Sequence, residues 1–208
     1  MQPRQLWFAN EILPLVHPHV DDSFVFHIVG ANNMPAEILA LNGTTMDRVQ
    51  GGKTGSTLGV RRIHVHGYVE DLRALYGTMR ISVAPLRWGA GVKGKINSAM
   101  KYGVPVVCTA VSTEGMFMEN RANAMVTAES DATAFAQSVV ELYNDENLWS
   151  RVRSGGLDNV RTYFSLSNAA EGMAQMLILA LQGEDRASRK IDLGTRALSL
   201  SRCNAAAR

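Results

Sequence analysis

Residues 85–95, Pro-Leu-Arg-Trp-Gly-Ala-Gly-Val-Lys-Gly-Lys, decide the expected fold of this chain. The short apolar run at residues 81–84 precedes them and predicts a buried strand. A helical pattern at residues 95–102 follows them and ends at Gly103-Val104-Pro105. A glycine-rich loop that joins a strand end to a helix start is the place where open α/β sheets bind ligands.

The charge of this loop indicates an anionic ligand. A helix N-terminus offers free backbone N–H groups and a partial positive charge, so Lys93 and Lys95 are unfavourable there unless an anion binds. We therefore predict a phosphate or diphosphate site at Gly89, Gly91 and Gly94, together with the two lysines. The alternative is a tight turn with solvated lysines, which the loop alone does not exclude.

The rest of the chain alternates between strand and helix patterns. Strands are predicted at residues 24–29, 63–66, 81–84, 104–108 and 124–126. Helices are predicted at residues 5–16, 35–41, 70–79, 95–102, 132–144, 146–162 and 167–181. Such alternation predicts an α/β fold, a Rossmann-like parallel sheet with helices on both faces. We expect the five strands to form a single sheet.

Composition narrows the classes of function. The chain has 208 residues, 46% of them hydrophobic and 19% charged, which is ordinary for a globular protein. A net charge of +2 does not indicate a nucleic-acid partner, and no apolar run approaches the length of a membrane span. The N-terminus lacks a secretory signal pattern, and Cys108 and Cys203 are not expected to pair. A reducing compartment, the cytoplasm, is expected.

Two segments carry no regular pattern. Residues 43–62 are predicted to be a mobile surface loop. Gly51–Gly55 does not qualify as a P-loop, because Asp47 stands where the motif needs a glycine and no strand precedes it. Residues 184–208 are expected to be a disordered tail.

No redox cofactor, nucleophile elbow or metal is expected. The first predicted strand is not followed by G-x-G-x-x-G, and the sequence has neither G-x-S-x-G nor an Asp-x-Asp pair. His64 and His66 share one face of a predicted strand, but two histidines without a nearby third ligand are a weak metal site.

An ordered series of short motifs resembles the C-terminal domain of the group 1 glycosyltransferases (family 4-like, GT-B fold). The resemblance covers about residues 5–182. Its pieces are Trp7-Phe8, Glu11 to Pro14, Phe26 to Gly30, Val65 to Leu72, Leu75-Tyr76, Val83 to Arg87, Gly89 to Ile96, Gly103 to Thr109, Glu114-Gly115 and Phe164-Ser165.

The resemblance implies that this chain is half of an enzyme. The family has two Rossmann-like domains, of which the N-terminal one binds the acceptor and the C-terminal one binds a nucleotide-sugar donor. Residues 1–183 would be that donor domain, with a separate acceptor-binding domain as partner. Transfer of a sugar to an acceptor hydroxyl, with retention of anomeric configuration, is implied for the pair. This chain alone is expected to be inactive.

The resemblance also assigns donor-binding residues. They are Gly30, Val69, Arg87, Gly89, Gly91, Lys93, Gly94, Lys95, Ser98, Glu114 and Gly115. Val69 would line the base pocket, and Arg87 would add positive charge unless it is only a surface residue. For Glu114-Gly115, the alternative to a donor-binding role is an ordinary surface turn. No catalytic residue is assigned.

This sequence departs from the family at an acidic pair. Many members carry two glutamates separated by seven residues across this loop and helix, where this chain has Ala90 and Ser98. Ala31 replaces an arginine that often follows the first glycine. Two rival functions therefore remain: a non-catalytic nucleotide-binding or interaction module derived from the fold, and a nucleotide-binding α/β domain of another enzyme.

Overall fold

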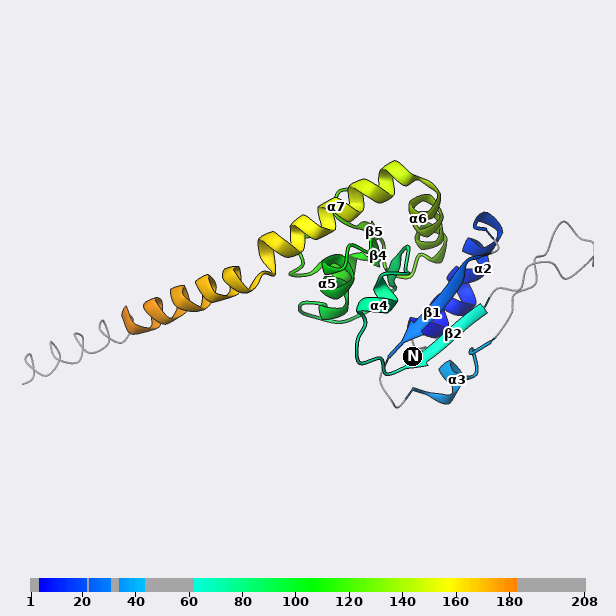
Figure 1. Ribbon diagram of the computed structural model, residues 1–208, viewed down its shortest axis with the longest axis horizontal. Helices are drawn as coiled ribbons and strands as arrows, with labels where there is room; N and C mark the ends of the chain where they lie inside the picture. Colours follow the sequence, from blue (N-terminus) through cyan, green and yellow to red (C-terminus); the bar gives the residue numbers. More distant parts are fainter. Residues whose placement is uncertain (1–3, 22, 31–33, 44–61, 183–208) are drawn as a thin grey trace, which may run out of the picture. The chain divides into compact units, whose positions relative to one another are not determined.

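A computed structural model describes residues 4–21, 23–30, 34–43 and 62–182 (Figure 1). Contacts within the chain divide it into two units, Met1–Tyr163 and Phe164–Arg208. The predicted domain boundary at residue 183 stays a prediction. The tail predicted at residues 184–208 lies outside the described residues, as does nearly all of the surface loop predicted at 43–62.

The N-terminal residues form one helical run with a widened turn in the middle. It comprises the α-helix α1 (Arg4–Trp7), the π-helix η1 (Phe8–Ile12), the α-helix α2 (Leu13–Val16) and the 3₁₀-helix η2 (His17–His19). The backbone N–H of Leu13 donates to the carbonyl of Phe8, one residue further back than in an α-helix. Pro14 follows directly, and a proline ring clashes with the carbonyl four residues before it, which the wider turn relieves. The predicted helix at 5–16 is confirmed.

Five parallel strands lie at the five predicted places, within two residues at each end. β1 (Val25–Val29) pairs with β2 (Arg62–Gly67), and β3 (Ser82–Ala84), β4 (Val106–Thr109) and β5 (Met125–Thr127) follow in the order β3-β4-β5. The parallel α/β class is confirmed. The expectation of a single sheet is wrong, because the strands form a two-stranded and a three-stranded sheet. β3 has only three residues, and its ladder is with β4.

The remaining described helices of the first unit lie between the strands and after β5. They are α3 (Ala36–Leu39), α4 (Arg73–Tyr76), α5 (Gly94–Lys101), the 3₁₀-helix η3 (Ala110–Thr113), α6 (Ala132–Asn144) and α7 (Glu146–Tyr163). The helix predicted at 70–79 is shorter in the structure, where it comprises only α4. The carboxylate of Asp71 accepts from the backbone N–H of Arg73 at 2.8 Å, so the chain turns at Asp71 before the helix begins.

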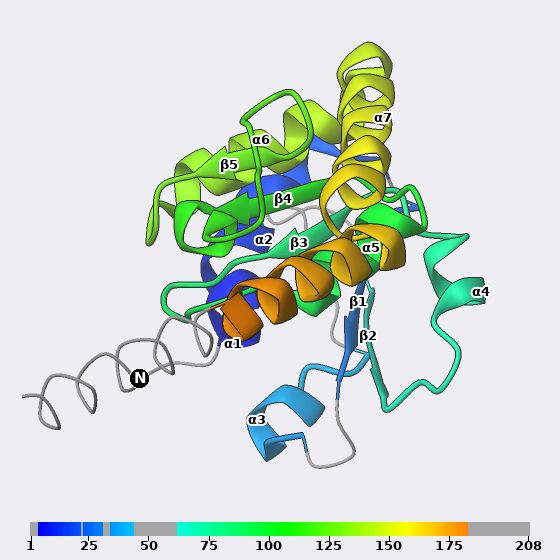
Figure 2. The same ribbon diagram turned by 90° about the vertical axis from the view of Figure 1, so that its left-hand side faces the viewer.

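The three-stranded sheet is covered on both sides, with α5 to one side and α6 to the other (Figure 1 and Figure 2). All four residues of β4 are buried, as expected of a parallel strand between two layers of helices. Val107 and Met125 join Phe135 of α6 in the main hydrophobic core, which also takes Ile28 and Ile63 from the other sheet. Burial raises the pKa of the Cys108 thiol to about 12, so this cysteine is an inert core residue.

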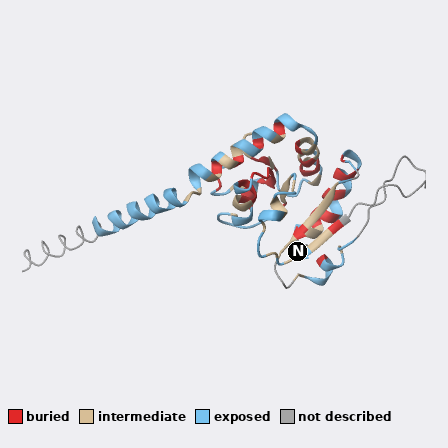
Figure 3. Cartoon of the chain, in the orientation of Figure 1, coloured by how far each residue is buried: buried red, intermediate tan, exposed pale blue. Residues whose placement is uncertain are grey.

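The second unit is described only at its start. Residues 166–182 are helical, and every one of them is exposed (Figure 3). Its exposed apolar side chains are Leu166, Met173, Met176, Leu177, Ile178, Leu179 and Leu181. Across the part of the chain that the structure describes, no helix combines the length and apolar character needed to cross a membrane.

Candidate functional site

The glycine-rich loop leaves the carboxyl end of β3 and enters α5, as the sequence predicts. Gly89 and Gly91 have φ values of 136° and 75°, a backbone conformation that residues with a Cβ rarely adopt. No side chain caps α5 and no acidic residue lies in its first turn. The N-terminus of this helix is therefore not neutralised by its own side chains, which leaves it available to an anion.

The two lysines of the loop have different environments. Lys93 is the half-buried residue immediately before α5, and its ammonium group donates to the carbonyl of Gly91. Lys95 is exposed in the first turn of the helix. Lys93 therefore folds back over the loop, whereas the side chain of Lys95 extends into solvent.

A second loop packs against the first. Gly115 has a φ of 70°, and a Cβ placed on it would lie 3.9 Å from a methyl group of Val92. The backbone N–H of Lys93 points at the sulfur of Met116, 3.2 Å away. Glu114, beside Gly115, is exposed. The structure thus brings together two predicted elements, the Gly89–Lys95 loop after β3 and the Glu114-Gly115 loop beyond β4.

Asn159, which no sequence motif singles out, is a buried residue that holds this second loop. The side-chain amide of Asn159 donates to the carbonyls of Phe117 at 2.7 Å and Met116 at 3.2 Å. Asn159 belongs to α7 and is 3% exposed. The sequence could have indicated this residue by its position alone, because Asn159 follows Val152 and Gly156 at helical spacing on the buried face of α7.

Ser98 and Arg87 are both engaged within the protein. The hydroxyl of Ser98 donates to the carbonyl of Gly94 at 2.9 Å, one turn back in α5. The guanidinium of Arg87 lies 5.7 Å from the ring centre of Trp7 and 5.3 Å from that of Trp88. Arg87 also lines a shallow pocket of about 210 Å³ together with Arg4, Gln5, Leu86 and Trp88. Of the predicted donor-binding residues, only Arg87 lines that pocket.

Gly30 and Val69 lie at the carboxyl ends of the other two strands. The backbone N–H of Gly30 donates to the carbonyl of Gly67 at 2.9 Å, which ties the end of β1 to the end of β2. Val69 is half-buried two residues beyond β2. Their grouping with the Gly89–Lys95 loop in one donor site stays a prediction.

Three histidines gather on the two-stranded sheet. His27 of β1 is the register partner of His64 on β2, and the His66 ring stacks on the His27 ring at 5.0 Å between centres. One ring nitrogen from each lies within 4.8 Å of the other two. Burial, and then the neighbouring rings of His66 and His64, hold the pKa of His27 below its usual value, which favours a neutral imidazole.

Comparison with known proteins agrees with this architecture. A sequence model of the family described as "Glycosyl transferases group 1" matches residues 2–145. The chain belongs to the group 1 glycosyl transferases. No curated protein sequence matches the chain.

Solved structures that resemble this group 1 chain show the same fold at low sequence identity. One is a single-residue mutant of S. aureus TarM in complex with fondaparinux, alpha-GlcNAc-glycerol and UDP (TM-score 0.65, 18% identity, 84% of this chain and 33% of that one). The others are Anabaena Alr3699/HepE in complex with UDP-glucose (TM-score 0.62, 14% identity, 82% and 45%) and sucrose-phosphate synthase from Thermosynechococcus elongatus (TM-score 0.53, 20% identity, 59% and 31%). This chain therefore spans 31–45% of the length of those three proteins.

Proposed function

We propose that this chain is the donor-binding half of a glycosyltransferase that moves a sugar from a nucleotide-sugar to an acceptor hydroxyl, with retention of anomeric configuration. The observation that carries the proposal is the meeting of two loops at the N-terminus of α5. Lys93 donates to Gly91 in one loop and its backbone N–H contacts Met116 of the other. Membership of the group 1 family supports it, as do the UDP and UDP-glucose held by the TarM and HepE structures.

The chemistry proposed for this site is charge stabilisation. As the bond from sugar to diphosphate breaks, negative charge grows on the leaving diphosphate. The N-terminus of α5, the amides of Gly89–Gly94 and the ammonium groups of Lys93 and Lys95 are the groups proposed to stabilise it. The guanidinium of Arg87, which lies over the Trp88 ring, would add further positive charge near the diphosphate. No metal ion or other cofactor is proposed for this step.

The acceptor side of the reaction is proposed to come from a separate N-terminal domain. This part of the proposal is supported by coverage, since this chain spans less than half of the length of its structural relatives TarM and HepE. Alone, the chain should bind the donor without transferring its sugar. The reducing, cytoplasmic setting expected from the cysteines belongs to the same proposal.

Nucleotide binding tests the proposal directly. Calorimetry should compare UDP with uridine on the parent chain, Lys93→Ala, Lys95→Ala and the double variant. Each charge-assisted contact is worth about 1.5–3 kcal/mol, so each substitution should weaken UDP binding about ten- to a hundredfold and leave uridine binding unchanged. Lys101→Ala is the matched control, because it removes the same charge from the exposed C-terminal end of the same helix.

The rival function has its own observation in favour of it. Ala90 and Ser98 occupy the positions of the acidic pair, and the Ser98 hydroxyl already has Gly94 as a partner. A non-catalytic module that still binds nucleotides would retain UDP affinity but release no UDP from UDP-sugars, even with an acceptor-binding domain present. A chain that binds neither UDP nor UDP-glucose would refute the donor-domain proposal and favour an interaction module.

A further inference from the structure

The three histidines of the two-stranded sheet have no part in the proposed donor chemistry. β1 and β2 run in parallel, with His27 opposite His64. The register shifts at His66, and the ring contact places that residue: the His66 ring stacks on the His27 ring at 5.0 Å between centres, so all three histidines lie on one face. The neighbours of His27 on β1 point the other way. Phe26 stacks on Phe8 at 4.4 Å between ring centres, and Ile28 is buried in the core. The histidine face is thus turned away from the main core.

The ring nitrogens of these histidines converge. Nδ1 of His27 lies 2.7 Å from Nε2 of His66, and the chosen nitrogens of all three rings lie within 4.8 Å of one another. Two nitrogen lone pairs facing at 2.7 Å repel unless a proton or a metal ion lies between them. A proton on one nitrogen satisfies the pair in the metal-free chain, and a cation can take the place of that proton once the ring switches tautomer.

We propose that His27, His64 and His66 form a binding site for one divalent transition-metal ion of the Zn²⁺ type. Three neutral imidazoles suit Zn²⁺, and a three-histidine site leaves a fourth coordination position for water. Zn–N bonds of about 2.0–2.1 Å place tetrahedral ligand nitrogens roughly 3.3 Å apart. Small rotations of the rings reach this spacing, since His66 is exposed and the other two side chains are half-buried.

The metal would link β1 to β2, because its ligands come from both strands. His27 and His66 are 39 residues apart in the chain, and the metal would close that segment. A ligand that binds only the folded chain stabilises it, so the metal should raise the stability of the two-stranded sheet. Magnesium should not substitute, because it prefers oxygen ligands. Metal binding by these three histidines does not depend on donor binding.

Metal titration of the tag-free full chain tests the site. After removal of metals with a chelator, Zn²⁺ should bind with a stoichiometry of one per chain, and Co²⁺ should give the visible absorption bands of a tetrahedral nitrogen site. When free Zn²⁺ exceeds its dissociation constant about a hundredfold, the melting temperature should rise by about 5–10 °C. Mg²⁺ should produce neither effect.

Single variants assign the ligands. His27→Gln, His64→Gln and His66→Gln should each weaken Zn²⁺ binding at least about a hundredfold, since changes outside the ligand shell alone cost ten- to a hundredfold. His19→Gln is the control, because His19 is an exposed histidine on η2 outside the cluster. Should one variant fail to fold, the other two and the Co²⁺ spectrum of the parent decide. Failure of the parent to bind Zn²⁺, unchanged binding in the folded cluster variants, or an equal loss in His19→Gln would overturn the site and leave only a hydrogen bond between His27 and His66.

Discussion

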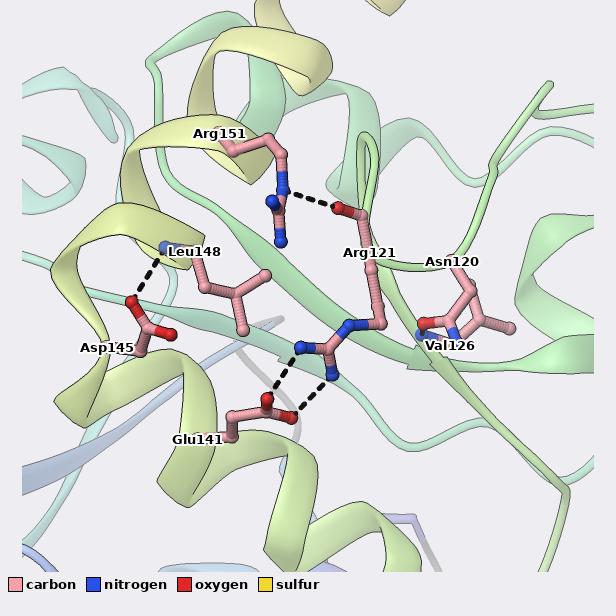
Figure 4. Close-up of polar contacts among 7 residues, drawn as sticks. All are labelled: Asn120, Arg121, Val126, Glu141, Asp145, Leu148 and Arg151. Atoms are coloured by element: carbon pink, nitrogen blue, oxygen red, sulfur yellow. Dashed lines mark hydrogen bonds and ion pairs between the residues drawn. The ribbon is translucent and has the colours of Figure 1, made fainter.

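Arg121 and Glu141 form a two-pronged ion pair between the loop before β5 and helix α6 (Figure 4). The two guanidinium nitrogens donate to the two carboxylate oxygens at 2.8 and 2.7 Å. Arg121 has a φ of 64°, and its own carbonyl accepts from the side chain of Arg151 on α7 at 3.1 Å. One strained loop residue thus joins α6 to α7.

Replacing Glu141 with Gln should cause a small loss of stability that depends on pH. The hydrogen bond from Arg121 is the main cause that lowers the pKa of Glu141 below its ordinary value of 4.5. The pair therefore stabilises the fold above about pH 4.5, and this contribution is lost as the pH falls below that value. Both side chains are partly exposed, so the melting temperature at pH 7 should fall by less than about 4 °C.

Thermal melts from pH 7 to pH 3 check this prediction. The difference between Glu141→Gln and the parent should shrink as the pH falls below about 4.5. Glu129→Gln, which neutralises an exposed carboxylate before α6, is the control and should change the melting temperature little at any pH. A difference that stays constant across the range would contradict an ionic origin.

Gly155 should not tolerate a side chain. A Cβ on this α7 residue would lie 2.2 Å from the backbone carbonyl oxygen of Ala122. Backbone cannot move aside cheaply, so Gly155→Ala should lower the free energy of unfolding by about 1–3 kcal/mol or more. In Gly172→Ala, by contrast, the new Cβ meets nothing within 4 Å in an exposed helix. That change should raise helix content, because alanine is a better helix former. Denaturant melts and circular dichroism measure both, and a harmless Gly155→Ala would show that the close approach is absent.

Asn159 should matter for stability through the loop that it holds. Asn159→Ala removes the donors to the carbonyls of Phe117 and Met116 and leaves a buried gap. Loss of buried partners costs about 1–3 kcal/mol in the free energy of unfolding. Asp158→Ala, at an exposed neighbouring position, should cost under about 0.5 kcal/mol. Equal losses in the two variants, measured by urea denaturation, would argue against the hydrogen bonds as the cause.

Introducing a carboxylate at Ser98 tests the departure from the family pattern. If this position faces the donor ribose, Ser98→Glu should strengthen UDP binding about tenfold through a charge-assisted hydrogen bond. Ser98→Gln, with the same shape and no charge, should gain less. Calorimetry with UDP and uridine should show the gain for both ligands, since both carry the ribose. Unchanged affinity in Ser98→Glu would place the ribose elsewhere.

Local patterns in the sequence located the five strands and the glycine-rich loop. The apolar run Val106-Val107-Cys108 predicted a strand covered on both faces, and β4 is fully buried. The sequence also predicted a glycine-rich loop between a strand and a helix at residues 85–95, and the structure places this loop between β3 and α5, with positive φ at Gly89 and Gly91. These features follow from the conformational preferences of neighbouring residues, so a single sequence suffices to find them.

The tertiary structure alone decided which distant residues meet. His66 lacked a third metal ligand until the parallel pairing of β1 with β2 brought His27 opposite His64. Asn159 reaches Phe117 across 42 residues, and the strands divide into two sheets. These contacts depend on strand register and on how helices pack, to which the whole chain contributes. Local propensity does not encode them, because each preference acts over only a few residues along the chain.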